Sequence, residues 1–168
     1  HLIELGAEPQ SITIVSNTPE LVEAPDERTD QPSAERLALV YTGFITNRRG
    51  LDDIVRVLRL PGAENWELHI AGTGPHERAL RRIGAELGVS DRIVWHGWIE
   101  HNALHELIAR CSVGLVPHPP NGHTNCTIPN KIFDYMANRL PVLVSDARPL
   151  VRVVRETGAG YSYRFGDE

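Results

Sequence analysis

From residue 37 to residue 163 the chain alternates between short apolar runs and segments whose apolar residues recur with a helical spacing. Short apolar runs bounded by glycines or polar loops are typical of buried strands. The spacing of Leu51, Ile54, Val55 and Leu58 forms one face of a helix. The runs predict strands at 37–41, 66–71, 92–95, 113–116, 141–145 and 160–163. This alternation predicts an α/β fold, a Rossmann-like parallel sheet with helices on both faces.

The residues before this pattern differ from it in composition. Residues 18–36 are rich in Pro, Asp, Glu, Thr and Gln, which is typical of an exposed linker. Residues 1–17 contain a strand-like run at 12–15. Because the first residue is His1 rather than Met, we expect the chain to be an excised piece of a longer protein. We expect one folded domain, at 37–168.

Bulk composition excludes several classes of function. A net charge of −5 argues against a general nucleic-acid binder. No apolar run approaches the roughly 20 residues that span a bilayer. The two cysteines, Cys111 and Cys126, do not make a disulfide scaffold, and they fit a reduced cytosolic setting. The composition therefore favours a globular protein in a cytoplasmic setting.

The segment from Ile128 to Asp146 is the most informative about function. Proline suits the first turn of a helix, so Pro129 predicts a helix start there. At about 100° per residue, one arc holds Asn130, Lys131, Asp134 and Tyr135, and the opposite arc is apolar. A cation suits a phosphate, and a carboxylate one turn further on suits the hydroxyl groups of a sugar. Together they predict a site for a nucleoside-diphosphate sugar.

A second cation is expected at the same edge of the sheet. The turn from Gly43 to Gly50 follows the first predicted strand and opens the first predicted helix. Ligands of open parallel sheets bind outside the carboxyl ends of the strands, where Gly43 lets a ligand approach the backbone. Arg49 could bind phosphate oxygens through its guanidinium fork. The alternative interpretation is a solvated basic turn.

Other motifs are open to more than one interpretation. Gly72-Thr73-Gly74 resembles the start of a dinucleotide fingerprint, but Glu77 stands where the third glycine belongs, so a nicotinamide site is not expected. His101 and His105 have the spacing of a zinc pair without a third ligand, and exposed helix histidines are the better interpretation. We expect no metal site.

Two loops at the ligand edge remain ambiguous. His118 and His123 flank a turn in the polar loop 117–127 and could donate to a sugar or phosphate, or be incidental surface residues. The aromatic residues of the run 95–98, Trp95 and Trp98 among them, could line a nucleobase slot or simply pack in the core.

With these motifs in view, the chain resembles the C-terminal, nucleotide-binding domain of a GT-B glycosyltransferase, close to glycosyltransferase family 4. The resemblance begins at about Leu37 and rests on the order and spacing of five motifs. These lie at 43–51, 69–74, 92–97, 129–136 and 141–146. It also implies that residues 1–17 are the end of the N-terminal domain and the crossover into this one, and that 37–168 lacks its closing helices.

The resemblance implies a function and residue roles. Enzymes of this family transfer a sugar from a nucleoside-diphosphate donor with retention of configuration, usually without a metal or other cofactor. By resemblance, Gly43, Arg49 and Lys131 bind the donor diphosphate, and Asp134 binds the ribose. The base-binding residues are Gly97 and Trp98, and the candidates for the donor loop are His123, Thr124, Asn125 and Asn130.

Two positions depart from the family pattern. The first acidic residue of the family's pair falls eight residues before Asp134, at Cys126, which cannot hold the donor sugar as a carboxylate would. The usual arginine after the first-strand glycine is Phe44. The Asn-Lys-Ile-Phe-Asp-Tyr-Met form of the motif belongs to a branch of the family that uses Lys131 and Arg49 instead.

The expected function is therefore donor binding for a retaining hexosyl transfer. The acceptor, a glycan or a lipid, would bind through an N-terminal domain outside this chain, and the parent enzyme could associate peripherally with a membrane. We expect this chain alone to be inactive. The alternatives are another GT-B sugar-nucleotide enzyme, such as a 2-epimerase, and a non-catalytic nucleotide-binding or interaction module.

Overall fold

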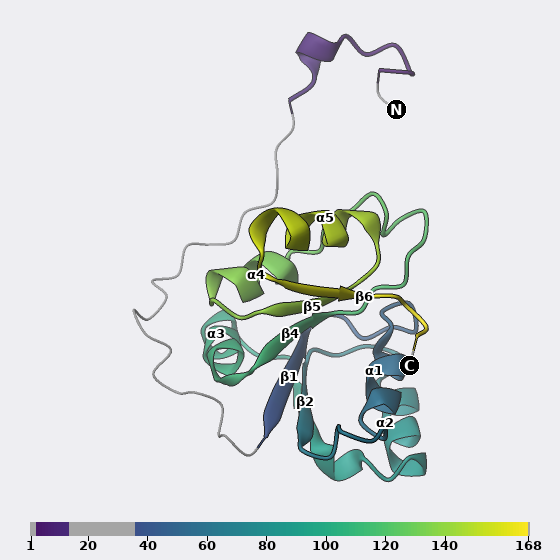
Figure 1. Ribbon diagram of the computed structural model, residues 1–168, viewed down its shortest axis with the longest axis vertical. Coiled ribbons are helices and arrows are strands. Elements are labelled where there is room, and N and C mark those ends of the chain that lie inside the picture. Colours follow the sequence, from purple (N-terminus) through teal and green to yellow (C-terminus); the bar gives the residue numbers. More distant parts are fainter. Residues whose placement is uncertain (1–2, 14–35, 168) are drawn as a thin grey trace.

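A six-stranded parallel sheet forms the centre of the protein in a computed structural model that describes residues 3–13 and 36–167 (Figure 1). The strand order is β3-β2-β1-β4-β5-β6, and every pairing is parallel. The strands are β1 (Leu37–Thr42), β2 (Trp66–Ala71), β3 (Ile93–Gly97), β4 (Val113–Val116), β5 (Val142–Ser145) and β6 (Gly160–Tyr163). The order reverses between β1 and β4, which is where ligands of such sheets bind.

Helices cover both faces of this sheet. The α-helices are α1 (Leu51–Val57), α2 (Glu77–Glu86), α3 (His101–Arg110), α4 (Lys131–Ala137) and α5 (Arg148–Thr157). Two 3-10 helices, η1 (Pro9–Ser11) and η2 (Ser90–Arg92), are also present. In Figure 1, α1 and α2 lie on one side of the strands and α3, α4 and α5 on the other. None of the helices in residues 3–13 and 36–167 combines the length and apolar character needed to cross a membrane.

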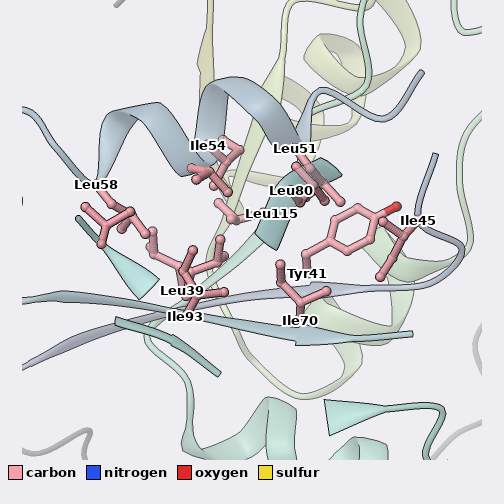
Figure 2. Packing of buried hydrophobic residues seen from close by; sticks show 13 residues of the cluster. Leu39, Tyr41, Ile45, Leu51, Ile54, Leu58, Ile70, Leu80, Ile93 and Leu115 are labelled. Atoms are coloured by element: carbon pink, nitrogen blue, oxygen red, sulfur yellow. The ribbon is translucent and has the colours of Figure 1, made fainter. Parts of the chain in front are cut away.

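Two apolar clusters fill the space between the sheet and its helices. Alternate residues of β1 point to opposite faces, so Leu39 and Tyr41 join one cluster and Val40 joins the other. In the first cluster Leu51 and Ile54 of α1, together with Leu58 directly after this helix, pack onto the sheet, as Figure 2 shows. The chain thus forms the two-sided core that its alternating pattern predicts.

The predicted Rossmann-like fold is confirmed, and five of the six predicted strands keep their bounds within one residue. The other, β3, runs two residues further, to Gly97. Helix α4 begins at Lys131, so Pro129 precedes the helix instead of occupying its first turn. Ile12 and Thr13 form no strand, and 14–15 lie outside the described residues, as does nearly all of the predicted linker. The domain boundaries stay predictions.

One residue of the helix 131–137 was assigned to the wrong face. The sequence pattern placed Tyr135 beside Lys131 on the ligand face, but its side chain is fully buried. The Tyr135 hydroxyl accepts from the backbone N–H of Thr42 at 3.0 Å. A Cβ at Gly114 of β4 would come within 2.5 Å of the Tyr135 ring, so only glycine leaves room for it. Gly114 in β4 therefore leaves the space that lets the Tyr135 side chain pack in the core.

Candidate functional site

Three glycine turns meet at the carboxyl end of the sheet, next to the switch in strand order. Gly43 follows β1, and its N–H donates to the carbonyl oxygen of Ala71 at 2.8 Å. The N–H of Gly72 donates to the carbonyl of Gly97 at 2.6 Å, which ties the β2 turn to the end of β3. A Cβ at Gly72 would lie 2.0 Å from the Gly43 oxygen. Glycine at position 72 is therefore required for the turns to meet.

A cavity of about 530 Å³ opens beside these turns, within the size range of small-molecule sites. Its lining comes from the ends of β1, β2 and β3 and from α3 and α4. The lining residues are Thr42, Gly43, Phe44, Ala71, Gly72, Thr73, Trp98, Ile99, Leu104, Asn130, Lys131 and Asp134. The cavity therefore combines a cation, a carboxylate and a large aromatic ring.

Lys131 places its ammonium group deep in this cavity. The Nζ atom lies 3.6 Å from the centre of the Tyr41 ring. A Cβ at Gly43 would lie 3.3 Å from Nζ, so glycine leaves space for the ammonium group. Burial, and secondly the charge of Arg49, lower the pKa of Lys131 well below its ordinary value. A bound anion would reverse this shift.

Arg49 approaches the same region from the start of α1. Its Nη1 atom lies 3.5 Å from Nε2 of His118, which follows β4 and is buried. Burial, together with the positive charges of Lys131 and Arg49, lowers the pKa of His118 to about 3. The imidazole is therefore neutral at physiological pH. The positive charges of Arg49 and Lys131 thus both act on this one ring, so the two turns that carry them lie in the same region.

Neither cation has a carboxylate within 4 Å among the residues that the structure describes. The nearest acid on the same helix, Asp134, is half-buried, and burial raises the pKa of its carboxyl. The charges of His105, His101 and Lys131 act in the opposite direction and favour the carboxylate. The site therefore holds two cations whose charge no neighbouring acid cancels at short range.

Residues 36–168 match the family described as Glycosyl transferases group 1. The chain belongs to the group 1 glycosyltransferases. A lipopolysaccharide 1,6-galactosyltransferase of Escherichia coli (strain K12) is 29% identical over 107 residues, which are 60% of this chain and 28% of the relative. A lipopolysaccharide core biosynthesis glycosyltransferase, LpsD, of Rhizobium meliloti is 31% identical over 97 residues, 56% of this chain and 27% of the relative. The chain thus spans less than a third of these relatives.

Solved structures of glycosyltransferases share the fold of this group 1 chain. The apo form of the lipopolysaccharide outer core galactosyltransferase WaaB matches 98% of this chain with a TM-score of 0.77 and 20% identity, over 45% of its own length. Anabaena Alr3699/HepE, solved in complex with UDP and glucose, matches 80% of this chain with a TM-score of 0.67 and 16% identity, over 36% of its length. At these identities the likeness establishes the Rossmann-like fold of GT-B enzymes.

The structure brings together most of the site residues predicted for this group 1 glycosyltransferase domain. Gly43, Trp98, Asn130, Lys131 and Asp134 all line the cavity. Gly97 lies next to it and accepts a hydrogen bond from the Gly72 N–H. Trp95, by contrast, packs against the first apolar cluster with Arg81 over its ring. Of the two tryptophans, Trp98 is thus the one placed to meet a ligand.

Of the predicted donor-loop residues, Asn130 lines the cavity, whereas His123, Thr124 and Asn125 are not among its lining residues. Thr124 is buried, and its hydroxyl donates to the carbonyl of Pro119 at 2.7 Å. The Asn125 side chain accepts from the backbone N–H of Arg148, at the start of α5, at 3.0 Å. These contacts give both side chains a role in shaping the loop. His123 and Cys126 are exposed.

Sequence reasoning missed a polar network behind Asp134. The Asn138 Nδ2 atom donates to the Asp134 carbonyl at 2.7 Å and to His105 Nδ1 at 2.8 Å. His105 Nε2 lies 3.0 Å from Nε2 of His101. The two histidines are thus neighbours of the predicted ribose-binding acid, and not merely surface residues. The described residues contain no group of three metal-ligating side chains.

Tyr41 is a second site residue that the sequence pattern does not reveal. It belongs to an apolar strand, and the sequence pattern assigns it to the core, where it lies fully buried. Only the structure shows that its ring face meets Lys131. A tyrosine directly before the strand-ending Thr42-Gly43 pair was the available signal, because the last residues of a parallel strand border the ligand edge.

Proposed function

We propose that this chain binds the nucleoside-diphosphate sugar used by a retaining, metal-independent glycosyltransferase. One observation carries the proposal: Arg49 lies 3.5 Å from His118, the charge of Lys131 acts on the same ring, and neither cation has a carboxylate within 4 Å in the described part of the chain. Two such cations, of which Lys131 lines the cavity and Arg49 does not, suit a ligand with linked phosphoryl groups. Burial strengthens their interaction with a diphosphate.

The chemistry of the lining residues supports a proposed place for the remaining parts of the donor. The diphosphate lies near Gly43, Lys131 and Arg49. The Asp134 carboxylate accepts hydrogen bonds from the ribose hydroxyls; burial raises its pKa, and the charges of His105, His101 and Lys131 partly offset that rise. The base lies against Trp98, which is 70% exposed and lines the cavity.

The relatives support a sugar donor and a glycan or lipid acceptor. Two of them are named as enzymes of lipopolysaccharide synthesis that transfer galactose or build its core. The HepE structure carries UDP and glucose. We therefore take a UDP-sugar as the first donor to test and hexosyl transfer as the reaction. A cytoplasmic location and peripheral contact with a membrane remain predictions.

The chemistry follows from charge and position. When the anomeric C–O bond breaks, negative charge develops on the departing diphosphate, and preorganised cations stabilise it. Lys131 and Arg49 supply positive charge in place of a divalent metal. Positioning of the donor against the acceptor supplies much of the remaining acceleration. The groups around the reacting carbon belong to the N-terminal part of the enzyme, so we expect this chain to bind donor and transfer nothing.

Two residues favour a second candidate, a non-catalytic nucleotide-binding module. Cys126 is exposed and offers no carboxylate for the donor sugar, and Phe44 occupies the rim where the family places an arginine. Both changes weaken contact with the sugar and leave the two cations in place. The two candidates therefore differ in sugar binding and agree on nucleotide binding.

Calorimetry with the 168-residue chain tests the proposal. UDP, GDP and ADP are compared with their nucleosides and with UDP-galactose and UDP-glucose. We expect one diphosphate to bind far more tightly than its nucleoside, and a UDP-sugar to bind at least as well as UDP. Failure of every nucleotide to bind at millimolar concentration would refute the proposal. A sugar that adds no affinity would favour the non-catalytic module, and turnover by this chain would refute its expected inactivity.

A further inference from the structure

We propose that Tyr41 and His118 are positioning residues, which hold Lys131 and Arg49 in place as neutral partners and leave both positive charges available to an anion. The inference rests on the proposed function and adds two residues to the site. Two neighbouring cations are ordinarily held together by a carboxylate between them. The proposal explains how Lys131 and Arg49 stay in the same region without one.

Tyr41 provides a rigid aromatic surface for the ammonium group. Its side chain is fully buried in the cluster under α1, next to Ile45 (Figure 2). The Tyr41 hydroxyl donates to the carbonyl of Phe44 at 3.0 Å, which fixes the rotation of the ring. Lys131 Nζ lies 3.6 Å from the ring centre, the distance of a cation–π contact. The ring therefore attracts the ammonium group without neutralising it.

His118 has the corresponding position relative to Arg49. Its backbone is anchored where β4 ends, because the Ser145 hydroxyl donates to the His118 carbonyl. A guanidinium only donates hydrogen bonds, so the His118 Nε2 atom that faces it presents its lone pair. The ring proton then lies on Nδ1. Burial and the two cations keep this ring neutral, since they lower the pKa of His118 to about 3.

Neutral partners have a consequence that carboxylates would not have. A carboxylate bound to Arg49 or Lys131 would compete with the ligand, and binding would require breaking an ion pair. Here the two cations repel each other, since the charge of Arg49 contributes, after burial, to the lowered pKa of Lys131. An anion relieves that repulsion when it binds. The site is therefore preorganised for a charged ligand.

The decisive experiment varies the ring at position 41 while keeping its shape. Calorimetry measures UDP and uridine binding to the wild-type chain, Tyr41→Phe, and chains with difluoro- and trifluorophenylalanine at position 41. Fluorine withdraws electron density from the ring face. UDP affinity should fall stepwise, to about tenfold below that of Tyr41→Phe, with uridine affinity constant within about twofold. A purely structural role for the ring would affect both ligands equally.

The outcomes separate this inference from the proposed function. Failure of the wild-type chain to bind UDP refutes the function. UDP affinity that is independent of fluorine content, in a chain that binds UDP, refutes the role of Tyr41. A ligand-free measurement adds to this: NMR of the Lys131 ε-CH₂ group should show an upfield ring-current shift that Tyr41→Leu removes. An unchanged shift would contradict the contact.

His118 is tested by three replacements under the same conditions. His118→Gln keeps a neutral acceptor and should bind UDP within about twofold of wild type, while His118→Leu should lose about fivefold. His118→Glu places a carboxylate against Arg49 and should lose the most, because it competes with the ligand. A His118→Glu chain that melts like wild type and binds UDP equally well would overturn the role of a neutral partner.

Discussion

Two clusters of ionisable side chains lie on this sheet, and they are built in opposite ways. On β2 and β3, Glu67 pairs with Arg36 at 2.9 Å and with His69 at 2.9 Å, and His69 contacts His96 at 3.0 Å. This first cluster contains its own counterion. At the ends of β1 and β4, Lys131 and Arg49 have an aromatic ring and a neutral imidazole as partners.

The difference indicates which cluster balances its own charges and which needs a ligand to balance them. The carboxylate of Glu67 opposes the effect of burial on His69 and so moderates the lowering of its pKa. At the second cluster no acid lies within 4 Å of either cation in the described residues, and the pKa values of Lys131 and His118 fall strongly. Cations in a cavity that have no carboxylate at short range are typical of a binding site, whereas a cluster that pairs its own charges needs no ligand to balance them.

The largest expected effect is the loss of the Lys131 charge. Lys131→Met keeps an unbranched apolar stem over Tyr41 and removes the cation. Because hydrogen bonds to charged groups contribute about 1.5–3 kcal/mol, UDP binding should weaken by about 10- to 100-fold. Uridine binding should change by less than about twofold, as measured by calorimetry. Arg36→Met, in the first cluster, is the matched control, and equal losses of UDP affinity in both variants would remove the distinction between the clusters.

The pH dependence of UDP binding sharpens the comparison. Burial lowers the pKa of Lys131 in the free chain, and a bound diphosphate raises it again. Between these two pKa values, binding takes up a proton, so UDP affinity should fall with rising pH by at most about tenfold per unit. Calorimetry in buffers of different ionisation enthalpy measures the proton uptake. Lys131→Met should abolish that uptake, and its persistence in the variant would assign it elsewhere.

A smaller effect concerns stability in acid. The pKa of His118 is about 3 when folded and about 6.5 when unfolded, so the unfolded chain binds more protons between these values. The stability that neutral His118 contributes is complete above pH 6.5 and decreases as pH falls, by at most about 1.4 kcal/mol per unit. Denaturant unfolding should show a shallower pH slope for His118→Gln. His69→Gln should change the pH slope of the unfolding free energy less than His118→Gln does. A larger change for His69→Gln would contradict the difference between the two clusters.

The smallest effect is expected in the first cluster. Arg36 is well exposed, with 59% of its side chain accessible, and exposed ion pairs contribute about 0–1 kcal/mol. Arg36→Ala should therefore shift the free energy of unfolding by less than about 1 kcal/mol and leave UDP binding unchanged. A measurable loss of UDP affinity in this variant would show that the paired cluster contributes to the site.

The strands were predictable because most of their runs are rich in apolar residues and end at turn residues. The runs at 66–71, 113–116 and 160–163 were predicted with the bounds that the structure shows. Helix α4 was harder, because Lys131 and Tyr135 share an arc and yet face different surroundings. Tyr135 turns into the core only because Gly114, on a different strand, leaves space for its ring. A helical pattern contains no information about that space.

The cations were predictable as a pair because both follow strand ends, which meet at one edge of a parallel sheet. Their partners were not. The Tyr41 ring contacts Lys131 across 90 positions of sequence, and its apolar context indicated only a core residue. The clustering of His101 and His105 near Asp134 likewise depends on how α3 lies against α4. Spacing within one helix cannot predict a contact with another.

A crystal structure of the chain with UDP tests the central claim most directly. The account predicts that the diphosphate oxygens lie within about 3 Å of Lys131 Nζ and of the Arg49 guanidinium, with Lys131 still over the Tyr41 ring. UDP bound with its phosphates elsewhere, or a carboxylate moving in to pair with either cation, would contradict it.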